Sequence, residues 1–168
     1  MRAEELREVQ APLKAQYRDD PDTAVVTLSA EASLGAGITC NVGTGRALAA
    51  AGLHPATGGS GAELCSGDML LEALAACAGV TMRAVSTSIG VPVEGTVHAE
   101  GDIDFRGTLA VDRDAPVGFR EIRLRFDLES DADEDALAKL IALTERYCVV
   151  LQSLQAPSPV AVDWARVG

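Results

Sequence analysis

One apolar helix constrains this chain more than any other feature of its sequence. Ser66 is a candidate N-cap, Asp68 lies in the first turn where the helix dipole favours an acid, and the helix is predicted to run to about Ser88, before a glycine and a proline. Between Ala73 and Met82 it is apolar on nearly every side. A helix without a polar face is buried all round, so we expect the rest of the fold to surround it.

The remaining sequence predicts strands and helices in the order α-β-β-α-β-β-α-β. The predicted elements are a helix over Ala3–Tyr17, strands over Thr23–Ala32 and Ile38–Val42 joined by a turn at Leu34–Gly37, a long loop over Gly43–Gly67, strands over Glu94–Phe105 and Phe119–Glu129 separated by a loop with some strand at Thr108–Val111, a helix over Asp131–Tyr147, a helical turn at Leu151–Leu154 and a closing strand over Pro159–Val167. Grouped strands around a buried helix favour an α+β fold over a doubly wound parallel sheet.

The charge balance argues against several classes of partner. The chain has 14 basic and 25 acidic residues, a formal net charge of −11, so we expect neither nucleic acid nor an anionic membrane surface as a partner. Residues 1–18 are highly charged and lack the apolar core of a signal peptide. The stretch Ala73–Met82 is too short to span about 30 Å of hydrocarbon. We therefore expect a soluble, cytoplasmic protein.

The cysteines are the residues whose chemistry is open. They are Cys40, Cys65, Cys77 and Cys148. A reducing cytosol argues against structural disulfides, there is no CxxC pair, and both histidines are far in sequence from any cysteine, so zinc-ligand spacing is absent. The cysteines are therefore either inert core thiols or redox-active ones.

Cys77 is a small hydrophobic residue by default, because burial raises the pKa of a thiol and the helix dipole fades within the first turn. A reactive Cys77 is expected to need a cationic partner brought by the fold. At about 100° per residue, Thr81 shares the face of Cys77, whereas Asp68 and Glu72 do not. Those two carboxylates can still position a cation near the start of the helix. Cys148, at the end of a helix, can likewise be interpreted as a structural core residue.

Two motifs together indicate a family. LLEALAAC (Leu70–Cys77) on the central helix and ERYCVVLQSL (Glu145–Leu154) resemble the osmotically inducible protein C and organic hydroperoxide resistance (OsmC/Ohr) family. The resemblance covers about Thr23–Val167, which suggests an N-terminal helical extension over residues 1–22 and an OsmC-like domain over 23–168. It implies strands around a long central helix and an intertwined homodimer with two active sites at the interface.

The resemblance also implies a chemistry. Cys77 would attack the peroxide oxygen and become a sulfenic acid, and Cys148 would resolve it to a disulfide. No bound cofactor is implied, since an external dithiol such as a lipoyl group, or a lipoylated protein, restores the pair. The expected substrate is a small organic hydroperoxide.

The chain departs from the family pattern near this pair. Ohr-type members place a glutamate where this chain has Gly67, and Asp68 is the best substitute, with Glu72 behind it. The family's activating arginine comes from the first hairpin turn, which has none here, so the nearest candidates are Arg46 and then Arg18. An alternative hypothesis is therefore a non-catalytic OsmC-like dimer that binds a small apolar ligand in its interface cavity.

Overall fold

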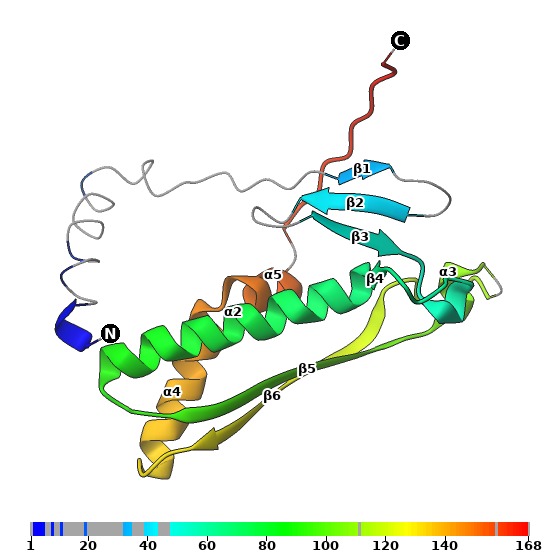
Figure 1. Cartoon of the computed structure of the whole chain (residues 1–168). Helices are drawn as coiled ribbons and strands as arrows, with labels where there is room; N and C mark the ends of the chain where they lie inside the picture. The colour runs from blue at the N-terminus through cyan, green and yellow to red at the C-terminus, as the bar shows by residue number, and fades with distance from the viewer. Residues whose placement is uncertain are drawn as a thin grey trace.

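The computed structural model describes residues 2–5, 8, 11, 19, 32–34, 39–43, 48–110, 112–156 and 158–167. In this part of the chain a long central helix is combined with largely antiparallel sheets, which confirms the α+β prediction. Figure 1 shows that helix, α2 (Ser66–Ile89), between a four-stranded sheet on one side and a two-stranded sheet on the other. Most of residues 1–31, with the predicted N-terminal helix and most of the first strand, lies outside the described residues, so the boundary at residue 22 stays a prediction.

The first sheet contains β1 (Ala32–Leu34), β2 (Thr39–Gly43), β3 (Leu48–Gly52) and β4 (Leu64–Cys65). Strand β2 agrees with the predicted second strand to within one residue at each end, whereas β1 overlaps the predicted first strand only at Ala32 and includes Leu34, which was predicted to be in the turn. The long loop predicted over Gly43–Gly67 is also wrong. It contains β3, which pairs antiparallel with β2 over five positions, and a 3-10 turn, η2 (Pro55–Thr57), before β4. The sequence LAAAG of β3 lacks β-branched alternation, so it becomes a strand through pairing with β2.

The central helix α2 (Ser66–Ile89) has 24 residues and ends at Gly90, which is left-handed with φ 70°. Its N-cap is Cys65, one residue before the predicted cap. The expectation of burial all round is wrong for the single chain, because the buried side chains form one stripe and Val80 is 73% exposed. That stripe consists of Leu74, Ala78, Met82 and Ser86. Their spacing of four residues keeps them on one face of the helix.

The second sheet pairs β5 (Glu94–Ile103) with β6 (Phe119–Glu129) in antiparallel register. The bounds of β6 are as predicted, since its apolar residues alternate with charged ones. Strand β5 ends two residues earlier than predicted. The strand expected at Thr108–Val111 is wrong, because α3 (Phe105–Thr108), which begins after the Asp104 cap, includes Thr108, and residues 109–110 form a turn.

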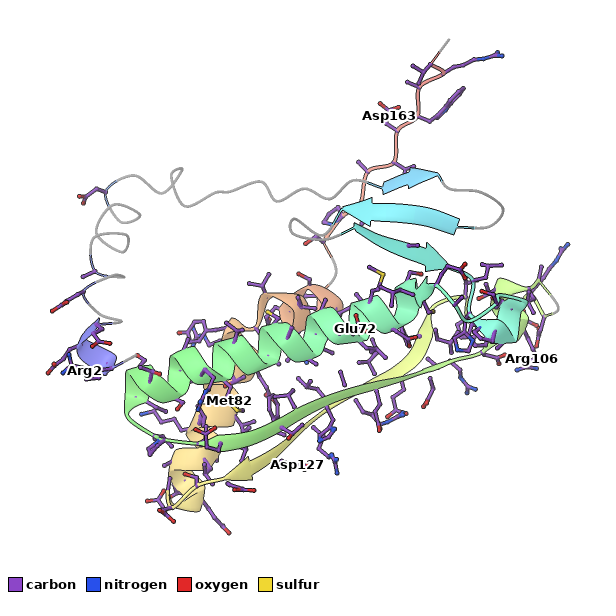
Figure 2. All side chains as sticks on the ribbon, in the orientation of Figure 1. Arg2, Glu72, Met82, Arg106, Asp127 and Asp163 are labelled. Atoms are coloured by element: carbon purple, nitrogen blue, oxygen red, sulfur yellow. The ribbon has the colours of Figure 1, made fainter. Side chains whose placement is uncertain are left out.

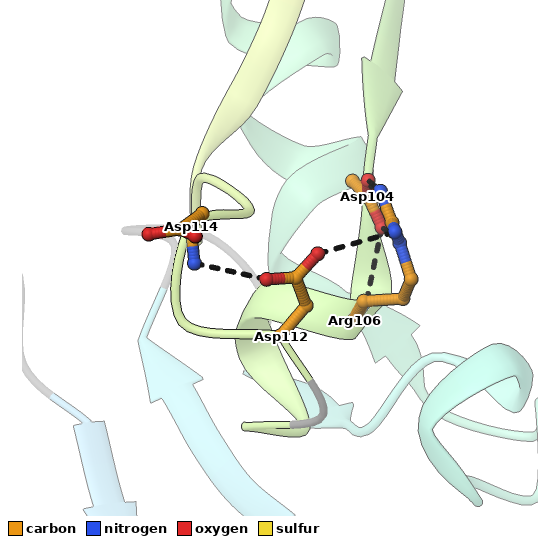
Figure 3. Close-up of polar contacts among 4 residues, drawn as sticks. All are labelled: Asp104, Arg106, Asp112 and Asp114. Carbon is orange, nitrogen blue, oxygen red and sulfur yellow. Dashed lines mark hydrogen bonds and ion pairs between the residues drawn. The ribbon is translucent and has the colours of Figure 1, made fainter.

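The connection between β5 and β6 is held by ion pairs (Figure 3). The guanidinium of Arg106 binds the carboxylates of Asp104 at 2.6 Å and Asp112 at 3.2 Å. The backbone N–H of Asp114 donates to the Asp112 carboxylate at 3.0 Å. These contacts join α3 to the loop that leads to β6.

Two helices follow, α4 (Glu134–Tyr147) and α5 (Val149–Gln155), with a break at Cys148. Helix α4 begins after Asp133, whose carboxylate accepts from the N–H of Ala136, and starts three residues later than predicted. The predicted turn after Cys148 is present as α5. Residues 158–167 are extended but form no strand, so the predicted closing strand has no partner within the described chain.

The core lies where α2 meets its neighbours. Leu74, Ala78 and Cys148 form one buried cluster, and Met82, Val93 and Leu140 form a second. Of the described helices, α2 alone is long and apolar enough to cross a membrane, with a mean hydropathy of 1.4. The sequence-based prediction concerned only the shorter apolar stretch Ala73–Met82, which could not span a membrane. Because α2 contacts β5, α4 and α5, it is the core helix of this fold.

Candidate functional site

The candidate site forms where the middle of α2 meets the junction between α4 and α5. Cys77 comes from α2 and is partly exposed, whereas Cys148 stands at the junction and is 0% exposed. Both thiols are free, Cys77 packs against the buried cluster that contains Cys148, and each thiol shifts the pKa of the other. Two cysteines far apart in the sequence therefore lie in direct contact.

The backbone break at Cys148 explains how this contact arises. Cys148 has φ −73° and ψ 104°, so it ends α4 and begins α5 without helical geometry. Its N–H donates to the carbonyl of Thr144 at 3.0 Å, and its carbonyl accepts from Gln152 at 2.9 Å. Because the first N–H groups of a helix have no partner within it, those of α5 remain available to neighbouring acceptors.

Two of these N–H groups reach Cys77. The backbone N–H groups of Val150 and Val149 lower the pKa of Cys77 as hydrogen-bond donors, as do the thiol of Cys148 and the hydroxyl of Thr81. Thr81, one turn further along α2, lies beside Cys77 as the helical spacing indicated. The two valine donors were missed by the sequence reasoning, because their position depends on the break at Cys148. The apolar run after Cys148 was the available signal, and it indicated only a helical turn.

The two thiols differ in acidity. Burial raises the pKa of Cys77, but the donors from Val150, Cys148, Thr81 and Val149 outweigh it and hold the pKa below the ordinary thiol value. Burial raises the pKa of Cys148, and the neighbouring Cys77 raises it further. Cys77 therefore ionises first, with Cys148 as its protonated donor. The sequence predicted that a cation is needed for this effect. In the described part of the chain the groups that lower the pKa of Cys77 are hydrogen-bond donors, and the candidate cations Arg46 and Arg18 lie outside that part, so the expected cation stays a prediction.

The two predicted supporting carboxylates lie away from Cys77. Asp68 and Glu72 line a cavity of about 440 Å³ against β5, on a different face of α2 from Cys77. Arg46 and Arg18 fall outside the described residues. Among the described arginines near the ends of α2 and α4, Arg83 binds Glu94 and the carbonyl of Val93, and Arg146 lies 5.5 Å from the centre of the Tyr147 ring.

Cys65 and Gly67 lie apart from this pair. Cys65 lines a cavity of about 130 Å³ with His54, whose ring stacks on Phe105 at 5.0 Å. Cys40 is a β2 residue whose side chain lies outside the description. Gly67 faces Cys65, Ile103 and Phe119, and a Cβ there would make only ordinary contacts. The described residues contain no group of three His, Cys, Asp or Glu side chains suited to a metal ion.

Comparisons with known proteins agree with the sequence resemblance. A family model described as OsmC-like protein matches residues 59–163. No curated protein sequence is a significant match. An OsmC-like protein from Mycoplasma pneumoniae has a similar structure, with a TM-score of 0.66 at 17% identity, over 79% of this chain and 89% of that one.

Two further similar structures have names that refer to hydroperoxides. The organic hydroperoxide resistance protein OsmC of Legionella pneumophila, also named a predicted redox protein, has a TM-score of 0.58 at 14% identity, over 79% of this chain and 91% of that one. The organic hydroperoxide resistance protein OhrB of Bacillus subtilis has a TM-score of 0.53 at 14% identity, over 79% and 93%. At these identities the structural likeness concerns the fold.

Proposed function

This chain belongs to the OsmC-like protein family, and on that premise we propose that it is a thiol-dependent peroxidase that reduces organic hydroperoxides. The observation that carries the proposal is the contact between a Cys77 thiol of lowered pKa and a protonated Cys148. The names of two similar structures, both organic hydroperoxide resistance proteins, support the choice of substrate class.

The first step uses Cys77 as the nucleophile. Its thiolate sulfur attacks the terminal oxygen of the hydroperoxide, so that an S–O bond forms while the O–O bond breaks. The alkoxide leaves with the electron pair of the O–O bond and takes up a proton to become the alcohol. Sulfur is oxidised to a sulfenic acid as the peroxide is reduced. Hydrogen bonds from Val149, Val150 and Thr81 keep the sulfur ionised before attack.

The second step uses Cys148. Its sulfur attacks the sulfenic sulfur, an S–S bond forms, and the departing hydroxide leaves as water with the Cys148 proton. An external dithiol, of the lipoyl type, then restores both thiols by two exchanges and itself becomes a disulfide. The protein needs no resident cofactor for this cycle.

The working form is proposed to be a cytoplasmic homodimer. A face of α2 next to Cys77 is apolar and exposed, with Leu70 at 36% and Val80 at 73% exposure. Covering this face with a second copy would shield the sulfur from water and leave an apolar approach for the organic part of the hydroperoxide.

A thiol count tests the peroxidase proposal. Reduced protein is mixed with one equivalent of cumene hydroperoxide, and free thiols are titrated over time. We expect two of the four thiols to disappear with one equivalent of cumyl alcohol formed. Cys65→Ser serves as the matched control and should behave as the wild type, because Cys65 lies in a different cavity.

The two site variants separate the steps. Cys77→Ser should abolish the rapid loss of thiols, and Cys148→Ser should accumulate a sulfenic acid that dimedone traps. If the wild type keeps all its thiols after prolonged exposure, the peroxidase proposal fails and the alternative, a binding protein for a small apolar ligand, takes its place.

A further inference from the structure

The backbone carbonyl of Glu145, in the last turn of α4, is bound by a side chain. In a continuous α-helix this carbonyl would accept from the N–H four residues later, which belongs to Val149. Among the described residues, no backbone hydrogen bond joins Val149 to Glu145. The Nε2 group of Gln152 donates to the Glu145 carbonyl at 2.9 Å instead. A side-chain amide therefore occupies the place of a backbone donor.

The N–H of Val149 is used at the candidate site. Together with the N–H of Val150 it lowers the pKa of Cys77 as a hydrogen-bond donor. Cys148 makes this possible, because its extended backbone, with ψ 104°, separates α4 from α5. Val150 and Cys77 also pack against the same buried cluster, which contains Cys148. The Val149 N–H thus has two possible acceptors, the Cys77 sulfur and the Glu145 carbonyl.

Gln152 is joined to both helices at this junction. Its backbone N–H donates to the carbonyl of Cys148 at 2.9 Å, so its main chain belongs to α5. Its side chain reaches back to Glu145 on α4, and a longer contact of 3.4 Å joins its Nε2 to Oε1 of Gln155. Figures 1 and 2 show the chain changing direction at this junction, where α4 and α5 lie beside α2. Gln152 therefore bridges the two helices across the change of direction.

The bond from Gln152 prevents a competing bond. The last carbonyls of a helix have no partner within it, so each binds a donor that comes within reach. For Glu145 the backbone donor next in line is the N–H of Val149, and a bond between these two groups would continue α4 into α5. Extension of an existing helix adds one hydrogen bond for each residue fixed, so this closure is favoured once the carbonyl is unoccupied.

We propose that Gln152 is a positioning residue of the candidate site: its side-chain amide occupies the Glu145 carbonyl and thereby leaves the Val149 N–H facing Cys77. Gln152 acts through the α4–α5 junction and not on the substrate. This role deepens the peroxidase proposal and rests on it for its catalytic meaning, because the nucleophile of that reaction is the Cys77 thiolate.

Alkylation of Cys77 over a pH series tests the inference in the full-length protein. Gln152→Met keeps a long unbranched side chain at an exposed position and removes the amide. Cys77 should then be less ionised, so its alkylation by iodoacetamide near neutral pH should slow by about 2- to 10-fold, the effect of one hydrogen bond. Gln155→Met is the matched control on the same helix, because it leaves the bond to Glu145 in place, and it should behave as the wild type.

A general loosening of the fold would have the opposite effect. Cys148 is 0% exposed, so partial unfolding of the junction would uncover both thiols and speed their alkylation. Slower alkylation of Cys77, with its half-maximal pH moved upward, therefore reports on the position of the donors. Faster alkylation of both thiols in Gln152→Met overturns the inference. Alkylation at the wild-type rate also overturns it, since water would then replace the amide without effect.

A second variant removes the N–H for which the two acceptors compete. Proline suits the first position of a helix, and the extended backbone of Cys148 suits a residue before proline, so Val149→Pro fits the junction. In this background there is no Val149 N–H for Glu145 to capture. Adding Gln152→Met should therefore change the alkylation of Cys77 by less than about 1.5-fold, as a double-mutant cycle measures. An equal slowing in both backgrounds overturns the inference.

The thiol count with cumene hydroperoxide separates this inference from the peroxidase proposal. If the wild type loses two thiols but Gln152→Met leaves the pH profile of Cys77 unchanged, the positioning role alone is rejected. If the wild type keeps its thiols while Gln152→Met shifts the profile, the peroxidase proposal alone is rejected, and Gln152 still positions the donors at Cys77.

Discussion

At the scale of single residues, the ionisation of Cys77 depends on groups from two places in the chain. Thr81 is its neighbour on α2, and Val149, Val150 and Cys148 come from the start of α5. Burial works against ionisation, so the donors must outweigh it. Without them Cys77 would be an inert core thiol, as its position in the middle of a helix indicates by default.

The first residue-scale prediction concerns pH. The folded-state pKa of Cys77 is lowered and that of Cys148 is raised, so the Cys77 thiolate persists as pH falls until its lowered pKa is crossed. Alkylation of Cys77 by iodoacetamide should reach half its maximal rate below pH 8.5, roughly the free thiol value, and alkylation of Cys148 above it. Mass spectrometry of the two peptides measures both, and a reversed order would contradict this assignment.

Removing one donor should weaken the ionisation. Thr81→Val deletes the hydroxyl that binds Cys77 and keeps the shape of the side chain, so the Cys77 pKa should rise and alkylation near neutral pH should slow by about 3- to 10-fold, on the basis of about 1 kcal/mol for one hydrogen bond. Thr87→Val is the control, because the Thr87 hydroxyl binds the carbonyl of Arg83. Equal rates in the two variants would exclude a role for Thr81.

At the scale of elements, the site depends on how α2 is placed against β5 and against the break between α4 and α5. The break directs the α5 N–H groups toward α2, and Thr144 supports it from within α4, fully buried and bonded to the carbonyl of Leu140 at 2.8 Å. The β5–β6 ladder supports α2 from the other side. A change that separates the two strands should therefore destabilise the whole domain.

Of the glycines in β5, Gly95 has the least room for an added side chain. Its φ is 141°, and a Cβ would lie 2.0 Å from the carbonyl oxygen of Asp127 on β6. Gly95→Ala should lower the free energy of unfolding by more than about 2 kcal/mol in urea titrations. Gly118→Ala is the matched control, with nothing within 4 Å of the added atom, and should change it by less than about 0.5 kcal/mol. Similar values for both would argue against this strand pairing.

At the scale of the whole molecule, the exposed face of α2 is the surface through which the proposed dimer would shield Cys77. Val80→Asp places a charge on that face, where Val80 is 73% exposed in the single chain. We expect the variant to fold but to shift toward monomer at micromolar concentration in analytical ultracentrifugation. Val117→Asp, at a loop position with 65% exposure, should dimerise as the wild type does, and a dimer unaffected by Val80→Asp would place the interface elsewhere.

A feature of this fold could be predicted from the sequence when the residues that cause it lie within one segment of the chain. Strand β6 was predictable because its apolar residues alternate within one segment, and the contact of Cys77 with Cys148 agrees with the resemblance of their two motifs. Strand β3 was not, because it forms by pairing with β2. The valine donors at Cys77 could not be predicted either, because their position depends on Cys148, a non-helical residue between two helices.

The most direct test of the central claim is a disulfide map of the wild-type protein after one equivalent of cumene hydroperoxide. The protein is alkylated, digested without reduction and analysed by mass spectrometry. We predict one linked peptide pair, Cys77 to Cys148, that disappears after treatment with dihydrolipoamide. Recovery of both cysteines as alkylated thiols, or a link from Cys77 to Cys65 instead, would contradict the account.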